Sequence, residues 1–209
     1  MDGETIRAAG LVLAGYLVGS IPFGVVVARL TGGRDPRTVG SGRTGGTNAL
    51  RAMGPLWGVV VGVLDIAKGC LPVLLARLLD AGALVEALVG VAAVLGASRS
   101  IYLRFHGGRG VATGIGAMLV ISPLVVLISA PIFFLVIGLS RYVSLGSLVG
   151  TAGAVAVLAL LVVAGLSPPV TLVYGVAAAG LIWLAHADNI ARLLRGEERK
   201  LSFAEERPR

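Results

Sequence analysis

The chain is poor in charged residues and in cysteine, and each shortage narrows the class of protein. Only 14% of its 209 residues are charged and 56% are hydrophobic, whereas soluble domains carry about 25% charge. The mean hydropathy is +0.91. We therefore exclude a soluble globular fold and expect an integral membrane protein, in which the 31 glycines let helices pack closely. The single cysteine, Cys70, excludes an internal disulfide.

Histidine and aromatic residues are also scarce. Two distant histidines, His106 and His186, and scattered carboxylates have no metal-ligand spacing, so we expect no metal and no cofactor. The formal net charge is +7, but five Phe, two Trp and four Tyr offer few rings to stack on bases, and the basic residues lie in loops beside apolar runs. We expect no nucleic-acid partner and interpret the charge as a signal of membrane topology. A Gly-x4-Gly-Lys-Ser/Thr motif is absent, so nucleotide hydrolysis is not indicated.

Long apolar runs indicate membrane-spanning helices, each of which needs about 20 residues to cross the hydrocarbon. The runs occupy residues 8–30, 53–79, 83–98, 111–139, 143–164 and 170–187. The first run has no obvious cleavage site, so we expect an uncleaved first span instead of a signal peptide. Ser122-Pro123 lies inside the fourth run, where it can divide the run into two passes that are short or partly re-entrant.

The positions of lysine and arginine decide between one pass and two for residues 111–139. If this run crosses twice and the first loop is cytoplasmic, only Arg7 and Arg77 lie outside and Lys68 lies within a span, as the positive-inside rule favours. If it crosses once, Arg141 and the C-terminal basic residues fall on opposite sides of the membrane. Two passes are therefore predicted.

The resulting architecture is an all-α, polytopic membrane protein of about seven transmembrane helices, with the N-terminus outside and the C-terminus cytoplasmic. We expect residues 1–209 to form one transmembrane domain that ends in a polar cytoplasmic tail, residues 199–209. Three polar clusters, residues 40–51, 104–113 and 186–198, then share the cytoplasmic face.

The first cluster is a glycine-dense polar loop. Glycine lets successive backbone N–H groups turn toward one anion, and hydroxyl, amide and guanidinium side chains add further donors. The residues of this predicted phosphate nest are Gly40, Ser41, Gly42, Arg43, Thr44, Gly45, Gly46, Thr47, Asn48 and Arg51. An ordinary linker between membrane helices has a similar composition, so the residues alone leave both interpretations open.

The second cluster leads directly into an apolar helix. Gly107, Gly108 and Gly110 free the backbone, Arg109 adds charge, and the helix start offers unsatisfied N–H groups to an anion. A positive-inside loop with glycines at a helix junction is the alternative.

The third cluster closes the last apolar run. His186 and Asn189 stand three residues apart, which would place them on one helix face, and Arg192 continues the same stripe. A histidine at a helix exit can be a structural residue or a catalytic one.

Further polar residues lie within or at the start of the spans. Asp65 and Lys68 stand three apart, so we expect a structural ion pair or a polar cavity. Ser144 and Ser147 begin the run 143–164, where they can reach the cytoplasmic face or act as helix caps.

Taken together, these segments resemble the bacterial glycerol-3-phosphate acyltransferases that use acyl phosphate as donor. The matching segments are Gly19–Gly24, Gly40–Arg51, Asp65–Gly69, Phe105–Thr113 and His186–Glu198. The resemblance implies seven helices in a bacterial plasma membrane, an active site on the cytoplasmic side, and transfer of an acyl group to the sn-1 hydroxyl of glycerol 3-phosphate. Its expected partners are glycerol 3-phosphate, acyl phosphate and membrane lipid; the oligomeric state is not implied.

The resemblance also implies roles for individual residues. Ser41 and Arg51 match the essential residues of the family's first motif, and Thr47 and Asn48 match its loop. The residues Gly107, Gly108 and Gly110 match a motif implicated in glycerol 3-phosphate binding. The motif with His186 and Asn189 is expected to be catalytic, Glu198 to be structural, and Ser147, with Ser144 as a second candidate, to contribute to the phosphate site.

The chain departs from the family pattern at five positions. These are Arg43, Gly46, Ala97, His106 and Arg109, where the family usually has Asn, Ala, His, Lys and Lys. Arginine binds phosphate through a planar fork, which is not equivalent to a lysine point charge. Two alternatives to an acyltransferase therefore remain: a small-anion transporter and a divergent, noncatalytic membrane regulator.

For the reaction itself we expect direct acyl transfer, because an acyl phosphate is already activated and needs mainly positioning and charge stabilisation. Ser41 could be a nucleophile, but a hydrogen bond from its hydroxyl to phosphate is the favoured interpretation. The departing phosphate or His186 could accept the proton. No His-x4-Asp motif is present, since Val111 and Ala191 stand at the corresponding positions.

Overall fold

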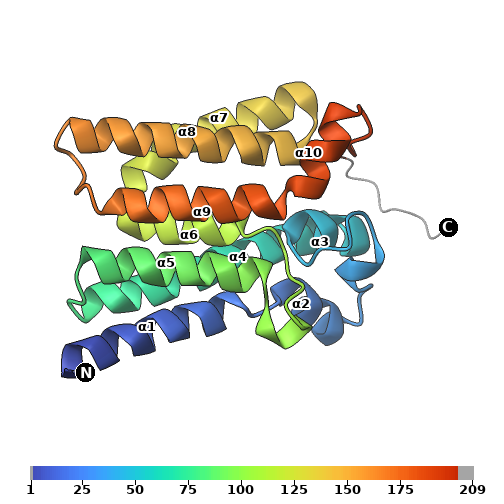
Figure 1. Ribbon diagram of the computed structural model, residues 1–209. Helices are drawn as coiled ribbons and strands as arrows, with labels where there is room; N and C mark the ends of the chain where they lie inside the picture. Colours follow the sequence, from blue (N-terminus) through green and yellow to red (C-terminus); the bar gives the residue numbers. More distant parts are fainter. Residues whose placement is uncertain (1, 202–209) are drawn as a thin grey trace.

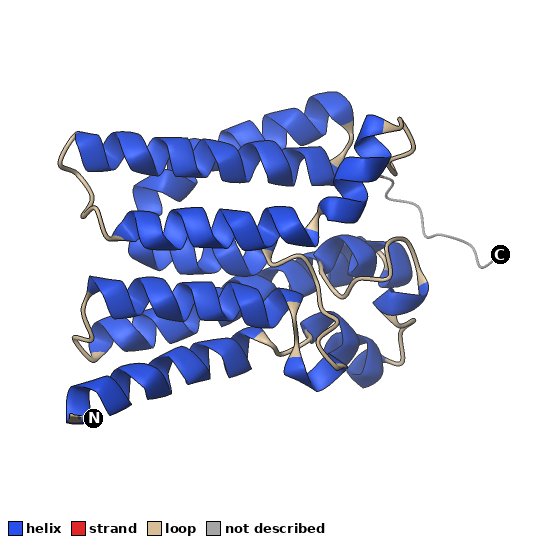
Figure 2. Cartoon of the chain, viewed as in Figure 1, coloured by secondary structure: helices blue, strands red, loops and turns tan. Residues whose placement is uncertain are grey.

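The computed structural model describes residues 2–201, which form α-helices and short 3-10 turns without any strand (Figure 2). The helices are α1 (Gly3–Gly19), α2 (Phe23–Thr31), α3 (Gly46–Met53), α4 (Pro55–Leu78), α5 (Ala83–Ser98), α6 (Val111–Ile121), α7 (Pro123–Ser140), α8 (Val143–Val163), α9 (Thr171–Ala185) and α10 (Ala187–Leu194). The 3-10 turns are η1 (Pro36–Thr38) and η2 (Ile101–Leu103). The expected all-α class is confirmed.

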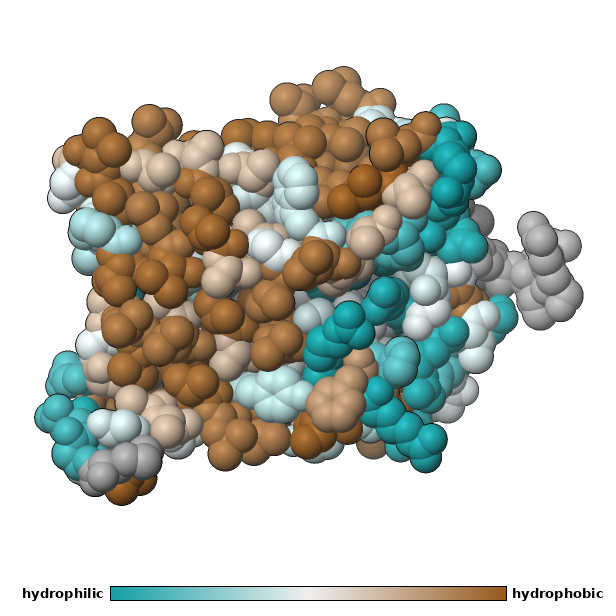
Figure 3. Space-filling view, in the orientation of Figure 1, coloured by the Kyte–Doolittle hydropathy of each residue, from teal (hydrophilic) through white to brown (hydrophobic). Residues whose placement is uncertain are grey.

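Helices α1, α4, α5, α6, α7, α8 and α9 run alternately between two ends of a bundle (Figure 1). The shorter helices α2, α3 and α10 gather at one end, which we call the polar end, and the chain begins at the opposite end. In Figure 3, hydrophobic side chains cover the flank of the bundle, while hydrophilic side chains gather mainly at the polar end. This distribution is that of an integral membrane protein, whose apolar flank faces lipid.

The long helices fit a membrane. By length and composition α4, α5 with the turn that follows it, α7 and α8 can each cross a bilayer, and up to six spans result if the bent pairs α1–α2 and α9–α10 each count as one. The predicted division of the fourth apolar run is confirmed, because α6 ends at Ile121 and α7 begins at Pro123. Helix α6 has 11 residues and is about 16 Å long, so it is short as predicted. Helix α7 has 18 residues, about 27 Å, and the prediction of a short fifth pass is wrong.

The first apolar run is not one straight span. Helix α1 ends at Gly19, α2 begins at Phe23, and their axes differ by 45°. Pro22 causes this break, because proline lacks an N–H and its ring disfavours helical geometry at Ile21. The apolar run of residues 8–30 is therefore a bent pair of helices, which can count as one broken span, and α2 contributes to the polar end (Figure 1).

The last apolar run also ends in a bend. Helices α9 and α10 meet at His186 with a change of direction of 61°. His186 therefore terminates α9, while Asn189 lies on α10. The prediction that these two residues share one helix face is wrong, although the bend leaves both of them buried.

Close contact between α4 and α6 holds the centre of the bundle. A Cβ atom added to Gly116 would lie 1.9 Å from the carbonyl oxygen of Ile66, and one added to Gly69 would lie 2.0 Å from that of Thr113. Only glycine permits this approach of two backbones, which places the start of α6 beside α4. The short α6 is enclosed by other helices, with most of its residues buried.

The prediction that Arg141 and the C-terminal tail lie on the same side of the membrane is supported by contacts at the polar end. An Nη2 of Arg141 donates to the carbonyl oxygen of Leu201 at 3.2 Å, and the N–H of Leu201 donates to the carbonyl of Arg141 at 2.7 Å. Arg141 and the start of the predicted tail are thus on the same side of the bundle. Residues 202–209 of that tail lie outside the described residues.

Candidate functional site

A polar cavity of about 520 Å³ lies at the polar end and contains residues from all three polar clusters. The predicted site residues that line it are Ser41, Thr47, Asn48, Arg51, Asp65, Lys68, Gly108, Arg109, Gly110, Ser147, His186, Asn189 and Glu198. Gly40, Gly42 and Gly107 are not among its lining residues. Segments that are far apart in the sequence therefore form one site.

The first cluster is only partly a loop, which corrects the sequence-based description of residues 40–51. Helix α3 begins at Gly46, with Gly45 as its N-cap, and Arg51 lies buried in its last turn. Because Gly45, Gly46 and Thr47 line the cavity, the N-terminal end of α3, where N–H groups are unsatisfied, borders the cavity. An anion at this position is favoured by the helix dipole.

Asn48 organises the loop that precedes α3. Its Nδ2 donates to the carbonyl oxygens of Pro36, Val39 and Arg43 at 2.9–3.3 Å. Its Oδ1 accepts from Arg51 Nη1 at 3.1 Å and from the N–H of Ser41 at 3.5 Å. These bonds use both donors and both lone pairs of the amide. A direct phosphate contact by Asn48 stays a prediction, and its present bonds are those of a loop scaffold.

The glycines outside the cavity support the loops by permitting close packing. Gly40 has a φ of +53°, and a Cβ atom there would lie 2.7 Å from Asn48 Oδ1. A Cβ atom on Gly107 would lie 2.3 Å from the carbonyl oxygen of Ala97 at the end of α5. Gly42 also has a positive φ, of +69°. These three residues shape the walls behind the cavity.

Arg109 connects the first cluster to the third. Its Nη1 donates to Ser41 Oγ at 3.2 Å, and its Nη2 donates to Asp188 Oδ2 at 3.0 Å. Asp188 Oδ2 also accepts from Arg192 Nη2 at 3.1 Å. Burial raises the pKa of the Asp188 carboxyl, but the charges of Arg109 and Arg192 outweigh this effect and the net shift is downward. Asp188 is therefore ionised at neutral pH.

Glu198 anchors the segment that follows α10. Its Oε1 accepts from Ser144 Oγ at 3.0 Å and from Asn189 Nδ2 at 2.7 Å, and its Oε2 accepts from Arg192 Nε at 2.8 Å. The carboxylate is nearly buried, with 8% of the side chain exposed. It joins α8 to α10, which agrees with the structural role expected for it. Since Tyr142 is the N-cap of α8, Ser144 and Ser147 are not helix caps.

His186 is buried at the bend between α9 and α10, with 2% of its surface exposed. Its Nδ1 lies 2.8 Å from the carbonyl oxygen of Ile182, and because a carbonyl only accepts, Nδ1 carries the proton and Nε2 has a free lone pair. Burial lowers the pKa of His186 to about 4. The imidazole is therefore neutral at physiological pH and can accept a hydrogen bond.

The expected ion pair in α4 is present. Lys68 Nζ lies 2.7 Å from Asp65 Oδ1 and donates to the carbonyl oxygen of Ile21 at 2.9 Å. It also lies 5.9 Å from the ring centre of Phe23. Lys68 thus satisfies a backbone carbonyl at the break between α1 and α2. The pair also lines the polar cavity, and its structural role stays a prediction.

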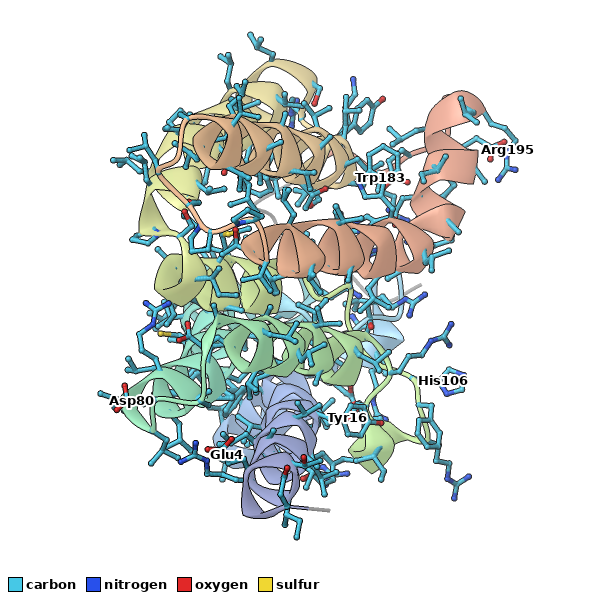
Figure 4. The ribbon with its side chains drawn as sticks, turned by 60° about the vertical axis from the view of Figure 1, so that its left-hand side comes forward. Glu4, Tyr16, Asp80, His106, Trp183 and Arg195 are labelled. Carbon is cyan, nitrogen blue, oxygen red and sulfur yellow. The ribbon has the colours of Figure 1, made fainter. Side chains whose placement is uncertain are left out.

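The five departures from the family pattern have different surroundings. Arg43, Gly46, Ala97 and Arg109 all line the polar cavity. A Cβ atom on Gly46 would lie 2.9 Å from the carbonyl oxygen of Gly58, so glycine permits closer packing of α3 on α4. His106 is exposed and points away from the bundle at the polar end (Figure 4). It therefore contributes nothing to the cavity wall.

Sequence reasoning assigned no role to Asp188 or to Arg192, although both belong to the network around the cavity. Their spacing of four residues on α10 is a recognisable signal for an ion pair. No local pattern predicts that Arg109, which is 79 residues from Asp188, completes the cluster. Within residues 2–201 no group of three or more His, Cys, Asp and Glu side chains could hold a metal ion.

A second, apolar cavity of about 270 Å³ adjoins the polar one and was not predicted residue by residue. It lies between α6, α7, α8 and α9. The residues that line both cavities are Ile66, Val111, Ile115, Phe133, Phe134 and Ser147. Two bonds brace its wall: Trp183 Nε1 donates to Thr151 Oγ1 at 3.0 Å, and Tyr174 donates from its hydroxyl to the carbonyl of Gly114 at 2.7 Å. Figure 4 shows Trp183 between α8 and α9.

Comparisons with known proteins agree on one family. The family model described as glycerol-3-phosphate acyltransferase matches residues 9–196. A glycerol-3-phosphate acyltransferase of Anaeromyxobacter dehalogenans (strain 2CP-C) is 49% identical over 94% of this chain and 98% of its own length. One of Anaeromyxobacter sp. (strain Fw109-5) is 46% identical over 95% of this chain and 98% of its own length.

Two solved structures are similar throughout. Both are crystal structures of PlsY, an integral membrane glycerol 3-phosphate acyltransferase. Its glycerol 3-phosphate form is 40% identical with a TM-score of 0.85, and its lysophosphatidic acid form is 37% identical with a TM-score of 0.83. Each alignment covers 94% of this chain and 96% of the other.

Proposed function

This chain belongs to the glycerol-3-phosphate acyltransferase family, and on that premise we propose that its two adjoining cavities hold the two substrates of acyl transfer. The protein is a membrane acyltransferase that acts on glycerol 3-phosphate. We propose acyl phosphate as the donor, with lysophosphatidic acid acylated at sn-1 and inorganic phosphate as the products. The observation that carries the proposal is that a cationic cavity and an apolar one share six lining residues.

The polar cavity suits two phosphate groups. Five arginines, Arg43, Arg51, Arg109, Arg192 and Arg199, line it together with the N-terminal ends of α3 and α6. Guanidinium groups bind phosphate in a bidentate manner, and helix N-termini add oriented N–H donors. Two phosphate groups held side by side would bring a free hydroxyl of glycerol 3-phosphate near the carbonyl carbon of the acyl phosphate.

The apolar cavity suits the fatty acyl chain. Its lining is almost entirely hydrophobic and reaches from Ser147, at the boundary with the polar cavity, to Ala154 and Val155 further along α8. Burying methylene groups there gains about 0.8 kcal/mol each. An acyl phosphate would therefore place its head among the arginines and its chain between α6, α7, α8 and α9.

The contacts of Ser41 support direct transfer. Its Oγ accepts a hydrogen bond from Arg109, and an activated nucleophile needs an adjacent base, which a guanidinium is not. In the proposed reaction the glycerol oxygen forms a bond to the acyl carbonyl carbon, the bond from that carbon to the phosphate oxygen breaks, and the glycerol proton leaves with a base. The departing phosphate oxygen, which carries the negative charge released by the broken bond, is a better acceptor than His186, whose pKa is lowered to about 4 by burial.

We also propose the membrane arrangement. Residues 1–209 would form one domain of seven passes in the bacterial plasma membrane, with the N-terminus outside and the polar end, including the tail from residue 199, in the cytoplasm. The positive-inside distribution of Lys and Arg supports this orientation. Labelling of a cysteine introduced at Arg141, in a Cys70→Ser background, tests it. An impermeant external reagent should not react in intact cells and should react after the cells are permeabilised.

Purified protein supplied with glycerol 3-phosphate and palmitoyl phosphate tests the reaction. Equimolar lysophosphatidic acid and inorganic phosphate are expected, and palmitoyl-CoA should not substitute for the acyl phosphate. Ser41→Ala and Arg51→Ala should each lower kcat/KM, by about tenfold or more for loss of one hydrogen bond to a charged group. A trapped acyl-Ser41 species would contradict direct transfer, and no product from intact protein would favour the transporter or the noncatalytic regulator.

A further inference from the structure

Asp188 lies behind the polar cavity and contacts two of its cations. It is not among the residues that line the cavity, whereas Arg109 and Arg192 are. Its Oδ2 accepts from Arg109 at 3.0 Å and from Arg192 at 3.1 Å. One carboxylate oxygen thus bridges the loop before α6 and helix α10, which are otherwise separate parts of the cavity wall.

The two partners of this bridge retain unused hydrogen-bonding capacity. Asp188 Oδ1 and Arg109 Nε are both buried and have no hydrogen-bond partner within the described protein. Arg109 is held at its two terminal nitrogens, with Nη1 on Ser41 and Nη2 on Asp188. The guanidinium plane is therefore constrained on two sides, while its Nε–H remains as a buried donor at the site.

We infer that Asp188 is a positioning residue that fixes the orientation of Arg109 for glycerol 3-phosphate. It acts through Arg109 and does not itself contact substrate. The inference rests on the proposed function of the polar cavity. Planarity matters here, because one guanidinium bonds Ser41 and Asp188 at once through two nitrogens held in one plane, whereas a lysine ammonium is a single point charge on a flexible stem. The arginine at position 109 and the carboxylate at position 188 therefore work as a pair.

Two effects of removing the carboxylate oppose each other. Loss of one negative charge makes the cavity more cationic, which favours phosphate binding by about fivefold at most for a partly exposed ion pair. Loss of a charged hydrogen bond releases Arg109 from its bound orientation, which disfavours phosphate binding by about tenfold or more. The side chain of Arg109 is only 17% exposed, so solvent replaces the lost partner poorly and the second effect should dominate.

The experiment compares Asp188→Asn with wild type in the purified protein, by steady-state kinetics with palmitoyl phosphate saturating and by calorimetric titration with glycerol 3-phosphate. KM and Kd for glycerol 3-phosphate should rise about tenfold, with kcat little changed, because the phosphate contact is equal in the ground and transition states. Asp188→Glu keeps the charge and should recover most of the loss. Asp35→Asn removes a partly exposed carboxylate paired with Arg37 and should leave both constants unchanged.

A double-mutant cycle with Arg109→Lys separates positioning from general structure. In the Arg109→Lys background, Asp188→Asn should change KM by less than about threefold, since the fork that Asp188 orients is gone. An equal effect in both backgrounds, or a wild-type KM in Asp188→Asn, would overturn the inference. So would a loss of affinity in Asp188→Glu as large as in Asp188→Asn.

Failure of the proposed acyl-transfer reaction can be distinguished from failure of the inference about Asp188. If wild-type protein binds glycerol 3-phosphate but makes no lysophosphatidic acid, the acyl-transfer proposal is wrong and the Kd comparison still tests Asp188. If wild-type protein neither binds nor reacts, both proposals are wrong. Thermal unfolding of each variant in detergent identifies a folding defect, in which case Asp188→Glu provides the comparison.

Discussion

A leucine at position 154 should shorten the acyl chains that the protein accepts. The residues of α8 that line the apolar cavity are Ser147, Gly150, Thr151, Ala154 and Val155, which recur every three to four positions as one face of a helix does. Ser147 also lines the polar cavity. Ala154 is seven residues further along the helix, about 10 Å from this boundary. A larger side chain there would obstruct the inner part of the cavity.

The size of the effect follows from the methylene groups that are displaced. Ala154→Leu adds three carbon atoms to the cavity wall and should exclude about three methylenes of the chain, each worth about 0.8 kcal/mol when buried. The loss of about 2.4 kcal/mol corresponds to about 50-fold in kcat/KM. This loss applies to donors long enough to pass residue 154, such as palmitoyl phosphate. Octanoyl phosphate, whose chain is half as long, should lose much less.

The assay measures lysophosphatidic acid formed from octanoyl, lauroyl, palmitoyl and stearoyl phosphate. The ratio of kcat/KM for palmitoyl to octanoyl donor should fall by about 50-fold in Ala154→Leu. Ala156→Leu is the matched control, because this alanine of the same helix is exposed, and its ratio should stay within about twofold of wild type. A wild-type ratio in Ala154→Leu would refute the placement of the acyl chain in this cavity.

Three further predictions concern stability. Glu198→Gln breaks a nearly buried ion pair with Arg192 and should lower the free energy of unfolding, measured with denaturant, by about 3 kcal/mol. The control Glu197→Gln, at an exposed carboxylate, should lower it by under about 0.5 kcal/mol. Equal losses in the two variants would contradict the anchoring role of Glu198. Because burial lowers the pKa of His186 to about 4, the unfolded chain binds a proton near its ordinary pKa and the folded protein does not. Stability should therefore fall as pH drops from about 6.5 to 4, by about 3 kcal/mol in total, and this fall should be absent in His186→Gln; parallel pH profiles would count against it. Gly116→Ala should lower the thermal midpoint strongly because its Cβ meets the backbone of α4, whereas Gly138→Ala, which meets nothing within 4 Å, should not.

Much of the architecture could be predicted from the sequence. The hydropathy of the runs identified the membrane helices, Ser122-Pro123 divided the fourth run, and the distribution of basic residues predicted that Arg141 and the tail share one side. These signals are local: a membrane selects apolar helices of a given length, and proline disrupts a helix wherever it lies. Pro22 carried the same signal, and the bend between α1 and α2 that it marks was not predicted.

The helical part of the first cluster was harder to predict. Residues 46–48 are glycine, threonine and asparagine, which have weak helix propensity, whereas residues 49–53 are strong helix formers. Tertiary packing overrides this preference, because Gly46 approaches α4 closely and the amide of Asn48 ties the helix to its preceding loop. The bend at His186 is likewise a product of packing and has no proline to mark it.

By itself the sequence determined the class of protein, the positions of its main helices and the chemical character of the three polar clusters, because hydrophobicity, charge and backbone freedom belong to each residue. The tertiary structure alone decided which groups meet. Arg109 bonds Ser41 and Asp188 across 68 and 79 residues, and the apolar cavity exists only where four helices pack beside the site. Such contacts depend on close backbone approaches such as that of Gly116 to α4, which set the distances between helices and have no signature within a single segment.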